Sequence, residues 1–196
     1  MNRFALALLA LIAIAPFSVS AQTEPGAPAS AVWTPSPKPM NPHEFNDPAM
    51  HFVAPSTWVL VGLRVIPIDQ LGDDPGVVAG WSNPTTPQAI IISQQLFEGD
   101  ASAFEVRFEN DTRQKSDGVL IKSKQAMSLK NGMPAYFIDA TYGSGFNTRK
   151  QFSVIWADGT RGVSITVTGR IGEIDADTAK KLLSDVSAVR YPTGRE

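Results

Sequence analysis

The second half of the chain alternates apolar and polar residues in a way that predicts consecutive β-strands. Such alternation places every second side chain on the same face of a sheet. Four segments show the pattern: residues 119–129, 133–142, 149–157 and 161–171. Asn131-Gly132 follows the first segment and Asp158-Gly159 follows the third, and both pairs suit tight hairpins because glycine readily adopts a positive φ. The pattern therefore predicts an antiparallel four-stranded meander.

Earlier segments predict further strands beside this meander. Residues 88–97 form an isoleucine-rich run that is the strongest strand signal in the first half of the chain. Residues 51–55 read as a short strand, and residues 58–68 continue with β-branched side chains. Gly62 and Pro67 interrupt that last segment, which favours a position at the edge of the sheet.

The segment 100–115 fits two kinds of secondary structure. Its residues AFEVRFEN alternate like a strand, whereas Phe104 and Phe108 also lie one helical turn apart. We interpret the segment as a helix, because Asp100 can serve as its N-cap and the polar stretch at its end suits a solvated helix terminus.

A second helix is predicted near the C-terminus, over residues 175–191 with Asp175 as the N-cap. Its apolar side chains fall on one stripe with a period of 3.6 residues: Ala179, Leu182, Leu183, Val186 and Val189. Segments 149–157 and 161–171 each offer one apolar face on which this stripe can pack. We therefore expect an α+β domain in which helices flank an antiparallel sheet.

The glycine-rich triplet Gly143-Ser144-Gly145 raises the question of a phosphate-binding loop. Such loops use the backbone amides at the N-terminus of a helix. The triplet lies between two predicted strands instead, so it is interpreted as the bend that joins them.

The first residues have the pattern of a secretory signal peptide. Arg3 precedes an unbroken apolar run over residues 4–15, which is too short for the roughly 20 residues of a membrane-spanning helix. Small residues at Val19 and Ala21 predict cleavage between Ala21 and Gln22.

The next segment, residues 22–42, contains six prolines and few large apolar side chains, which predicts a disordered linker. Residues 43–196 are then expected to form a single domain. The chain carries 17 basic and 19 acidic side chains and no cysteine, so nothing in it favours nucleic acid or disulfides. No second long apolar run suggests a membrane span in the mature protein. The short leader indicates a bacterial protein of the periplasm or one that is secreted.

Several local motifs resemble the PsbP-like and Mog-type superfamily, including its bacterial periplasmic branch typified by DcrB. They are HFVAPSTW at residues 51–58, KNGMPAYF at residues 130–137 and the capped helix at the end. The resemblance covers residues 51–191 and implies an antiparallel sheet sandwiched by helices and, usually, no enzymatic activity. Plant members assist the oxygen-evolving complex of photosystem II, and the yeast member binds a small GTPase. No partner-contact motif of those proteins is matched by residues of this chain.

Candidate metal and catalytic residues are few. His43 and His51 are eight residues apart with Pro48 between them, which fits no metal-binding motif and suggests ordinary polar side chains. The aspartates at 69, 73 and 74 lack the spacing of a calcium loop. Without cysteine or a nucleophile elbow, no catalytic residues, metal or cofactor are assigned. Asp139 could be a desolvated acid, but a cross-strand pairing role is the plainer interpretation.

Trp81 is the aromatic residue that we expect to be exposed, because it lies between Gly80 and Ser82 in a proline-rich stretch. Exposed aromatic residues often anchor partners, although Trp81 could instead cover a sheet edge. One hypothesis is an exported, non-catalytic accessory protein that binds a protein or another component of the cell envelope. The alternative is a small-ligand carrier or enzyme whose pocket, between sheet and helix, is lined by Trp81, Tyr136, Tyr142 and Phe146.

Overall fold

A computed structural model describes residues 41–47, 50–64, 66–116, 118–184 and 186–188. The predicted signal peptide, its cleavage site at Ala21 and Gln22, and residues 22–40 of the predicted linker lie outside the described residues. All of the described residues belong to the domain that begins at Asn41.

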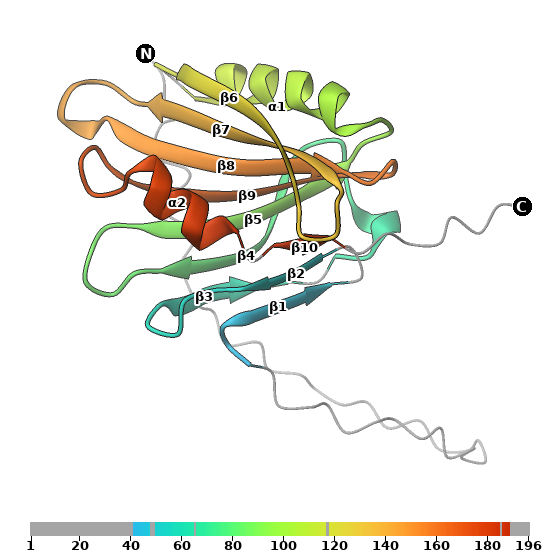
Figure 1. The fold of residues 1–196 in the computed structure, drawn as a ribbon, viewed down its shortest axis with the longest axis horizontal. Helices are drawn as coiled ribbons and strands as arrows, with labels where there is room; N and C mark the ends of the chain where they lie inside the picture. Colours follow the sequence, from blue (N-terminus) through green and yellow to red (C-terminus); the bar gives the residue numbers. More distant parts are fainter. Residues whose placement is uncertain (1–40, 48–49, 65, 117, 185, 189–196) are drawn as a thin grey trace, which may run out of the picture. The chain divides into compact units, whose positions relative to one another are not determined.

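The domain is built on a seven-stranded antiparallel sheet (Figure 1). From one edge to the other, its strands follow the order β3-β4-β5-β9-β8-β7-β6. Their bounds are Val59–Leu63 for β3, Gly76–Ser82 for β4, Ala89–Leu96 for β5, Leu120–Ser128 for β6, Pro134–Tyr142 for β7, Arg149–Ala157 for β8 and Arg161–Arg170 for β9. The predicted edge position of β3 and the predicted strand over residues 88–97 are both confirmed.

The four-stranded meander is confirmed, because β6, β7, β8 and β9 pair with one another in sequence order. The two glycines that were expected to turn the chain do so with positive φ angles, 80° at Gly132 and 97° at Gly159. Residues with a side chain rarely adopt such φ angles without strain, so these glycines set where each hairpin turns and hence its register.

A small second sheet was not predicted. It consists of β1 (Glu44–Asp47), β2 (Met50–Val53) and β10 (Ser187–Ala188), with β2 in the middle. β10 lies in the segment that we expected to be helical, and this part of the prediction is wrong. The extended backbone lets Ala188 pair with Met50 while Val186 and Ala188 both reach the core, at 1% and 4% exposed.

Both predicted helices are present. α1 spans Ala101–Lys115, and Asp100 caps it by accepting a hydrogen bond from the backbone N–H of Ala103 at 2.8 Å. α2 spans Ala176–Leu183 and ends earlier than predicted, with Asp175 as its cap. Two short 3-10 helices, η1 (Ile68–Gln70) and η2 (Gly145–Asn147), lie in loops. Neither α-helix of the described part is long and apolar enough to cross a membrane.

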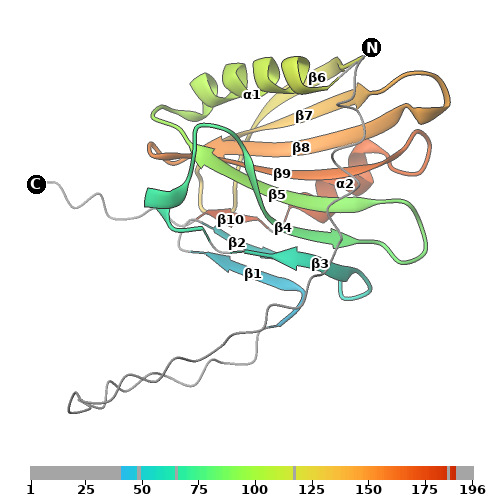
Figure 2. The same ribbon diagram turned by 180° about the vertical axis from the view of Figure 1, so that it is seen from behind.

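The two helices lie on opposite faces of the main sheet (Figures 1 and 2). α2 and the small sheet cover the face that carries the larger core, which includes Phe52, Trp81, Phe152, Trp156, Ile165 and Leu183. α1 covers part of the other face, where a smaller core contains Phe104, Ile138, Ile155 and Ala157. The result is the expected α+β fold, an antiparallel sheet between helices.

Candidate binding site at the Tyr142 end of the main sheet

Trp81 does not lie on the surface, and the expectation that it would be exposed is wrong. It is 1% exposed and packs against Phe52 in the larger core, with the ring centroids 5.6 Å apart. Its indole Nε1–H donates to the backbone oxygen of Pro42 at 2.8 Å. The proline-rich surroundings were a misleading signal, because β4 lies inside the sheet between β3 and β5.

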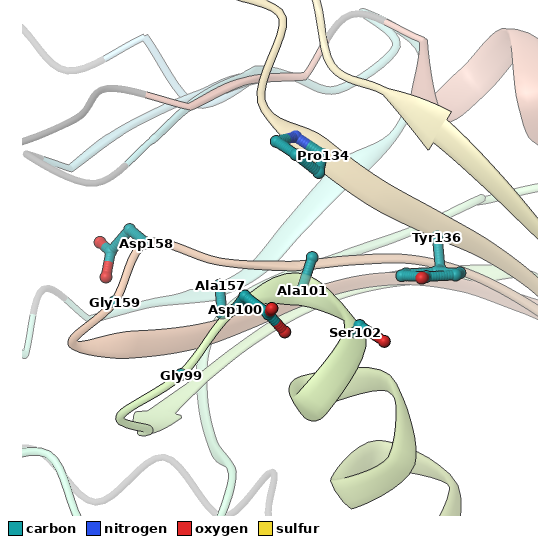
Figure 3. A pocket seen from close by; sticks show the side chains of 9 residues that line it. All are labelled: Gly99, Asp100, Ala101, Ser102, Pro134, Tyr136, Ala157, Asp158 and Gly159. Atoms are coloured by element: carbon teal, nitrogen blue, oxygen red, sulfur yellow. The ribbon is translucent and has the colours of Figure 1, made fainter.

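Tyr136 lies on the opposite face of the sheet from Trp81. It packs at the border of the smaller core and lines an open depression of about 380 Å³ (Figure 3). The other walls are the start of α1 and the turn between β8 and β9, together with the first residue of β7: Gly99, Asp100, Ala101, Ser102, Pro134, Ala157, Asp158 and Gly159.

The two carboxylates at this depression already accept hydrogen bonds from the backbone of the fold. Asp100 accepts the hydrogen bond that caps α1. Asp158 accepts hydrogen bonds from the backbone N–H groups of Thr160 and Arg161, at 3.0 and 2.8 Å, and thereby closes the β8–β9 turn. Both groups therefore have a structural task, and the depression offers no free acid for proton transfer among its lining residues.

The glycine-rich triplet is a tightly packed bend between β7 and β8, as predicted. Gly143 has a φ of 87°, and a Cβ atom there would lie 2.8 Å from the backbone oxygen of Asn147. Gly118 precedes β6, and a Cβ atom there would lie 2.7 Å from the backbone oxygen of Gly143. These glycines allow two backbones to meet. Phe146 belongs to η2 in this bend, and its side chain lies outside what the structure describes.

Tyr142 ends β7 at the side of the sheet where this bend lies, and it begins a row of three side chains. In the register of the sheet, Tyr142 pairs with Arg149 of β8, and Arg149 pairs with Arg170 of β9. Directly opposed residues on neighbouring strands project from the same face. We call Tyr142, Arg149 and Arg170 the Tyr142 row. It occupies the face that carries α1.

Tyr142 extends across β8 to reach β9. Its hydroxyl lies 3.0 Å from Oγ1 of Thr168, two strands away. The Thr168 hydroxyl donates its own proton to the backbone oxygen of Lys150 at 3.2 Å, so Tyr142 is the donor in the bond between the two hydroxyls. This places the phenol ring over β8, beside Arg149. The ring thus forms a fixed and partly exposed surface.

The neighbouring positions on the same face carry a hydrogen-bonded polar ladder. Gln151 donates from Nε2 to Oγ of Ser153 at 3.2 Å, and Ser153 lies 2.8 Å from Oγ1 of Thr166 on β9. The sheet beside the Tyr142 row is therefore held by bonds between side chains, and the polar groups of this ladder have partners within the fold.

Arg149 and Arg170 are directly opposed cations. Like charges at such positions destabilise a strand pair. Arg149 donates from Nη1 to the backbone oxygen of Pro87 at 3.4 Å, which is a long hydrogen bond. Arg170 is exposed, and the described part of the chain gives its guanidinium no hydrogen bond or ion pair. The arrangement concentrates positive charge beside an aromatic ring.

Other candidate residues from the sequence are involved in local pairing. His51 lies 3.0 Å from Glu44 across β1 and β2, and this hydrogen bond, after that from Asn46, lowers the pKa of Glu44. No three His, Asp or Glu side chains gather as metal ligands within the described residues. Asp139 forms a cross-strand ion pair with Lys150, which was the plainer of the two interpretations.

Two of the three aspartates of the β3–β4 loop, Asp73 and Asp74, likewise contact α1. Asp74 lies 2.7 Å from Lys115, and this hydrogen bond is the main cause of the lowered pKa of Asp74. Asp73 accepts a hydrogen bond at its backbone oxygen from Arg107 at 3.4 Å. These two loop aspartates therefore lie against a helix whose basic side chains they bind.

Of the three residues in the row, only Tyr142 was identified from the sequence, and Arg149 and Arg170 were missed. A signal for them was present in the Asp158-Gly159 turn. From this turn, successive residues of β8 and β9 pair without a register shift. Counting outward from that turn along the sequence places Arg149 opposite Arg170.

Comparisons with known proteins bear on the fold. A scan against protein-family models and a search of curated proteins gave no match. Among solved structures, the chain is similar to the cyanobacterial PsbP (CyanoP) of Synechocystis sp. PCC 6803, with 16% identity and a TM-score of 0.53, over 74% of this chain and 91% of that one. It is also similar to a protein of unknown function, PA94, from Pseudomonas aeruginosa, with 14% identity and a TM-score of 0.48, over 66% of this chain and 96% of that one. The first of these similarities shows that the described domain has a PsbP-like α+β fold.

Proposed function

We propose that this protein is an exported, non-catalytic accessory protein that binds a protein partner in the bacterial cell envelope. The leader-like residues 1–21 support export, and the proline-rich residues 22–40 that precede the domain would tether it. The PsbP-like fold is compatible with such a role, and membership of the periplasmic DcrB-like branch is part of this proposal.

The observation that carries the proposal is the Tyr142 row. An arginine guanidinium stays protonated in proteins, so Arg149 and Arg170 are suited to binding and not to transferring protons. Tyrosine and arginine are also the residue types enriched where partners contribute most to binding energy. Three such side chains in register on a partly uncovered sheet face form a surface for contact.

The alternative of a small-ligand carrier required Trp81, Tyr136 and Tyr142 around one cavity. The structure places Trp81 in the larger core, on the face of the sheet opposite the two tyrosines. Tyr136 and Tyr142 are also six positions apart along β7, which corresponds to about 20 Å along a strand. These three side chains therefore do not converge, and the surface interpretation is favoured.

Site-specific cross-linking in bacterial cells tests the proposal. A photoreactive amino acid at Ser144, which is exposed beside Tyr142, should trap a discrete partner protein from the envelope. The matched control is Lys181, an exposed position on α2 on the other side of the sheet, which should not trap that protein.

The same cells test export. N-terminal mass spectrometry of the cell-envelope fraction should show a chain that begins at Gln22. A cytoplasmic chain that retains residues 4–15, or equal labelling from Ser144 and Lys181, would contradict the proposed function.

A further inference from the structure

The Tyr142 row contains two opposed arginines, and neither of them forms an ion pair within the described residues. Arg149 and Arg170 are opposed on β8 and β9, and backbone spacing holds their Cα atoms roughly 4.5 to 5.5 Å apart. Like charges on directly opposed residues weaken a strand pair. Two arginines elsewhere do meet carboxylates: Arg107 lies 3.0 Å from Asp111, and Arg161 lies 3.4 Å from Asp47.

The acidic residue nearest to Arg170 in the sequence bonds its backbone and not its guanidinium. Glu173 lies three residues after Arg170, and its Oε2 accepts the backbone N–H of Arg170 at 2.9 Å. Its backbone oxygen accepts from Gln88 at 2.8 Å, so Glu173 has a role in the turn that follows β9. No ion pair joins its carboxylate to the guanidinium of Arg170 within the described residues.

We propose that Arg149 and Arg170 together receive a carboxylate from an acidic, extended segment of the partner protein, and that the Tyr142 ring packs against that segment. This inference rests on the proposed function and specifies the chemistry of the partner. A carboxylate placed between the two guanidiniums would replace their mutual repulsion by two charge-assisted hydrogen-bonded pairs.

The surroundings favour an acidic polypeptide over an anionic membrane. Binding to a membrane surface needs several basic residues on one broad face. Here the row supplies only two arginines, Glu173 and Asp175 follow Arg170 closely in the sequence, and the whole chain carries a net charge of −2. The ring of Tyr142, held over β8 by Thr168, offers instead a firm apolar surface of the size of a peptide side chain.

A peptide-binding experiment tests the inference on the mature chain. The probe is a fluorescent decapeptide of alternating glutamate and serine, and its comparison is the same peptide with glutamine in place of glutamate. Anisotropy should show binding of the acidic peptide only, weakening as salt is raised. The double variant Arg149→Gln with Arg170→Gln should weaken binding at least tenfold.

Two further variants separate recognition from general charge. Arg149→Lys with Arg170→Lys keeps the charge but loses the planar fork, so it should bind more weakly than the wild type and more tightly than the double glutamine variant. Arg113→Gln removes an exposed charge from the end of α1 and should bind as the wild type does. Arg170→Gln should also leave the thermal midpoint unchanged or raise it, because it removes repulsion in the free protein.

Each contrary result has a definite meaning. Unchanged peptide binding by the double glutamine variant, or a marked drop in the midpoint of Arg170→Gln, would overturn the inference. Binding to vesicles that contain phosphatidylglycerol, without binding to the peptide, would replace it by a membrane contact. If cross-linking from Ser144 still traps a partner in the double glutamine variant, the proposed function stands and only the acidic-segment inference fails.

Discussion

The ring of Phe104 on α1 lies directly on Gly162 of β9. A Cβ atom at position 162 would be 2.0 Å from Cε2 of Phe104, which is far inside van der Waals contact. Phe104 is 2% exposed and is the centre of the smaller core, with Phe97 at 5.0 Å between ring centroids. This glycine therefore determines how closely α1 approaches the sheet.

Replacing Gly162 by alanine should destabilise the domain. The added methyl group must displace a buried aromatic ring, and overpacking of this kind typically costs about 1 to 3 kcal/mol. Chemical denaturation of the purified mature chain measures the change. Gly80→Ala is the matched control, because its nearest neighbour would be the backbone oxygen of Ile90 at 3.6 Å and its φ is not positive. That substitution should be neutral or stabilising by up to about 1 kcal/mol. Equal effects of the two substitutions would contradict the packing argument.

Trp81→Ala should lower stability severely, because it removes a side chain that is 1% exposed from the larger core. Loss of a buried aromatic side chain costs about 3 to 5 kcal/mol. Trp81→Phe keeps most of the volume but loses the hydrogen bond to Pro42, so its cost should be smaller. Thermal melts of both variants measure this order, and a Trp81→Ala midpoint close to that of the wild type would show that the side chain is not a core residue.

Arg161 and Asp47 form an ion pair that links the small sheet to the main sheet. Arg161 is 2% exposed, and Asp47 also accepts a hydrogen bond from Gln94 at 3.3 Å. Removing one member leaves a buried charge, so Arg161→Met should cost about 3 to 5 kcal/mol. Adding Asp47→Leu to that variant should restore part of the loss, because one of the two carboxylates that Arg161 meets is then gone, the other being Asp158 at 3.5 Å. Urea denaturation of the two single variants and the double variant measures the coupling, and strictly additive losses would show that the two side chains do not act as a pair.

Asp175 should make the stability of the domain depend on pH at the acid end. Its hydrogen bond from the backbone N–H of Thr178 is the first cause of its lowered pKa. Because folding lowers this pKa, the stabilisation is complete above the ordinary carboxyl pKa of about 4 and is lost as the pH falls toward the folded value. Asp175→Ala should therefore melt below the wild type at pH 7, and the difference should shrink in acid. Asp177→Ala removes an exposed acid two residues further on and is the control, and a difference for Asp175→Ala that persists unchanged in strong acid would argue against the cap.

The register of the meander could be read from the sequence because glycine turns are local. Gly132 and Gly159 adopt positive φ angles that side chains rarely tolerate, so the two hairpins have few alternative alignments. The same logic places Arg149 opposite Arg170. The candidate site was thus within reach of sequence reasoning, although only Tyr142 was identified from it.

The small sheet and the position of Trp81 could not be read in the same way. β10 has only two residues, and its pairing depends on Met50, which lies far away in the sequence. Asn131 in the β6–β7 turn also donates from its side-chain amide to the backbone oxygen of Ala188, which holds β10 in place. Helical periodicity in this segment was real but was outweighed by burial of Val186 and Ala188 in an extended conformation.

The sequence by itself determined the hairpins, the two capped helices and the order of strands within the meander, because these depend on residues close together along the chain. Only the tertiary structure decided that Trp81 is buried, that a second sheet forms, and that Tyr142, Arg149 and Arg170 share a partly uncovered face. The physical reason is that burial and exposure depend on which distant segment covers a face. The residues next to Trp81 or Arg170 in the sequence therefore do not predict whether these side chains are buried or exposed.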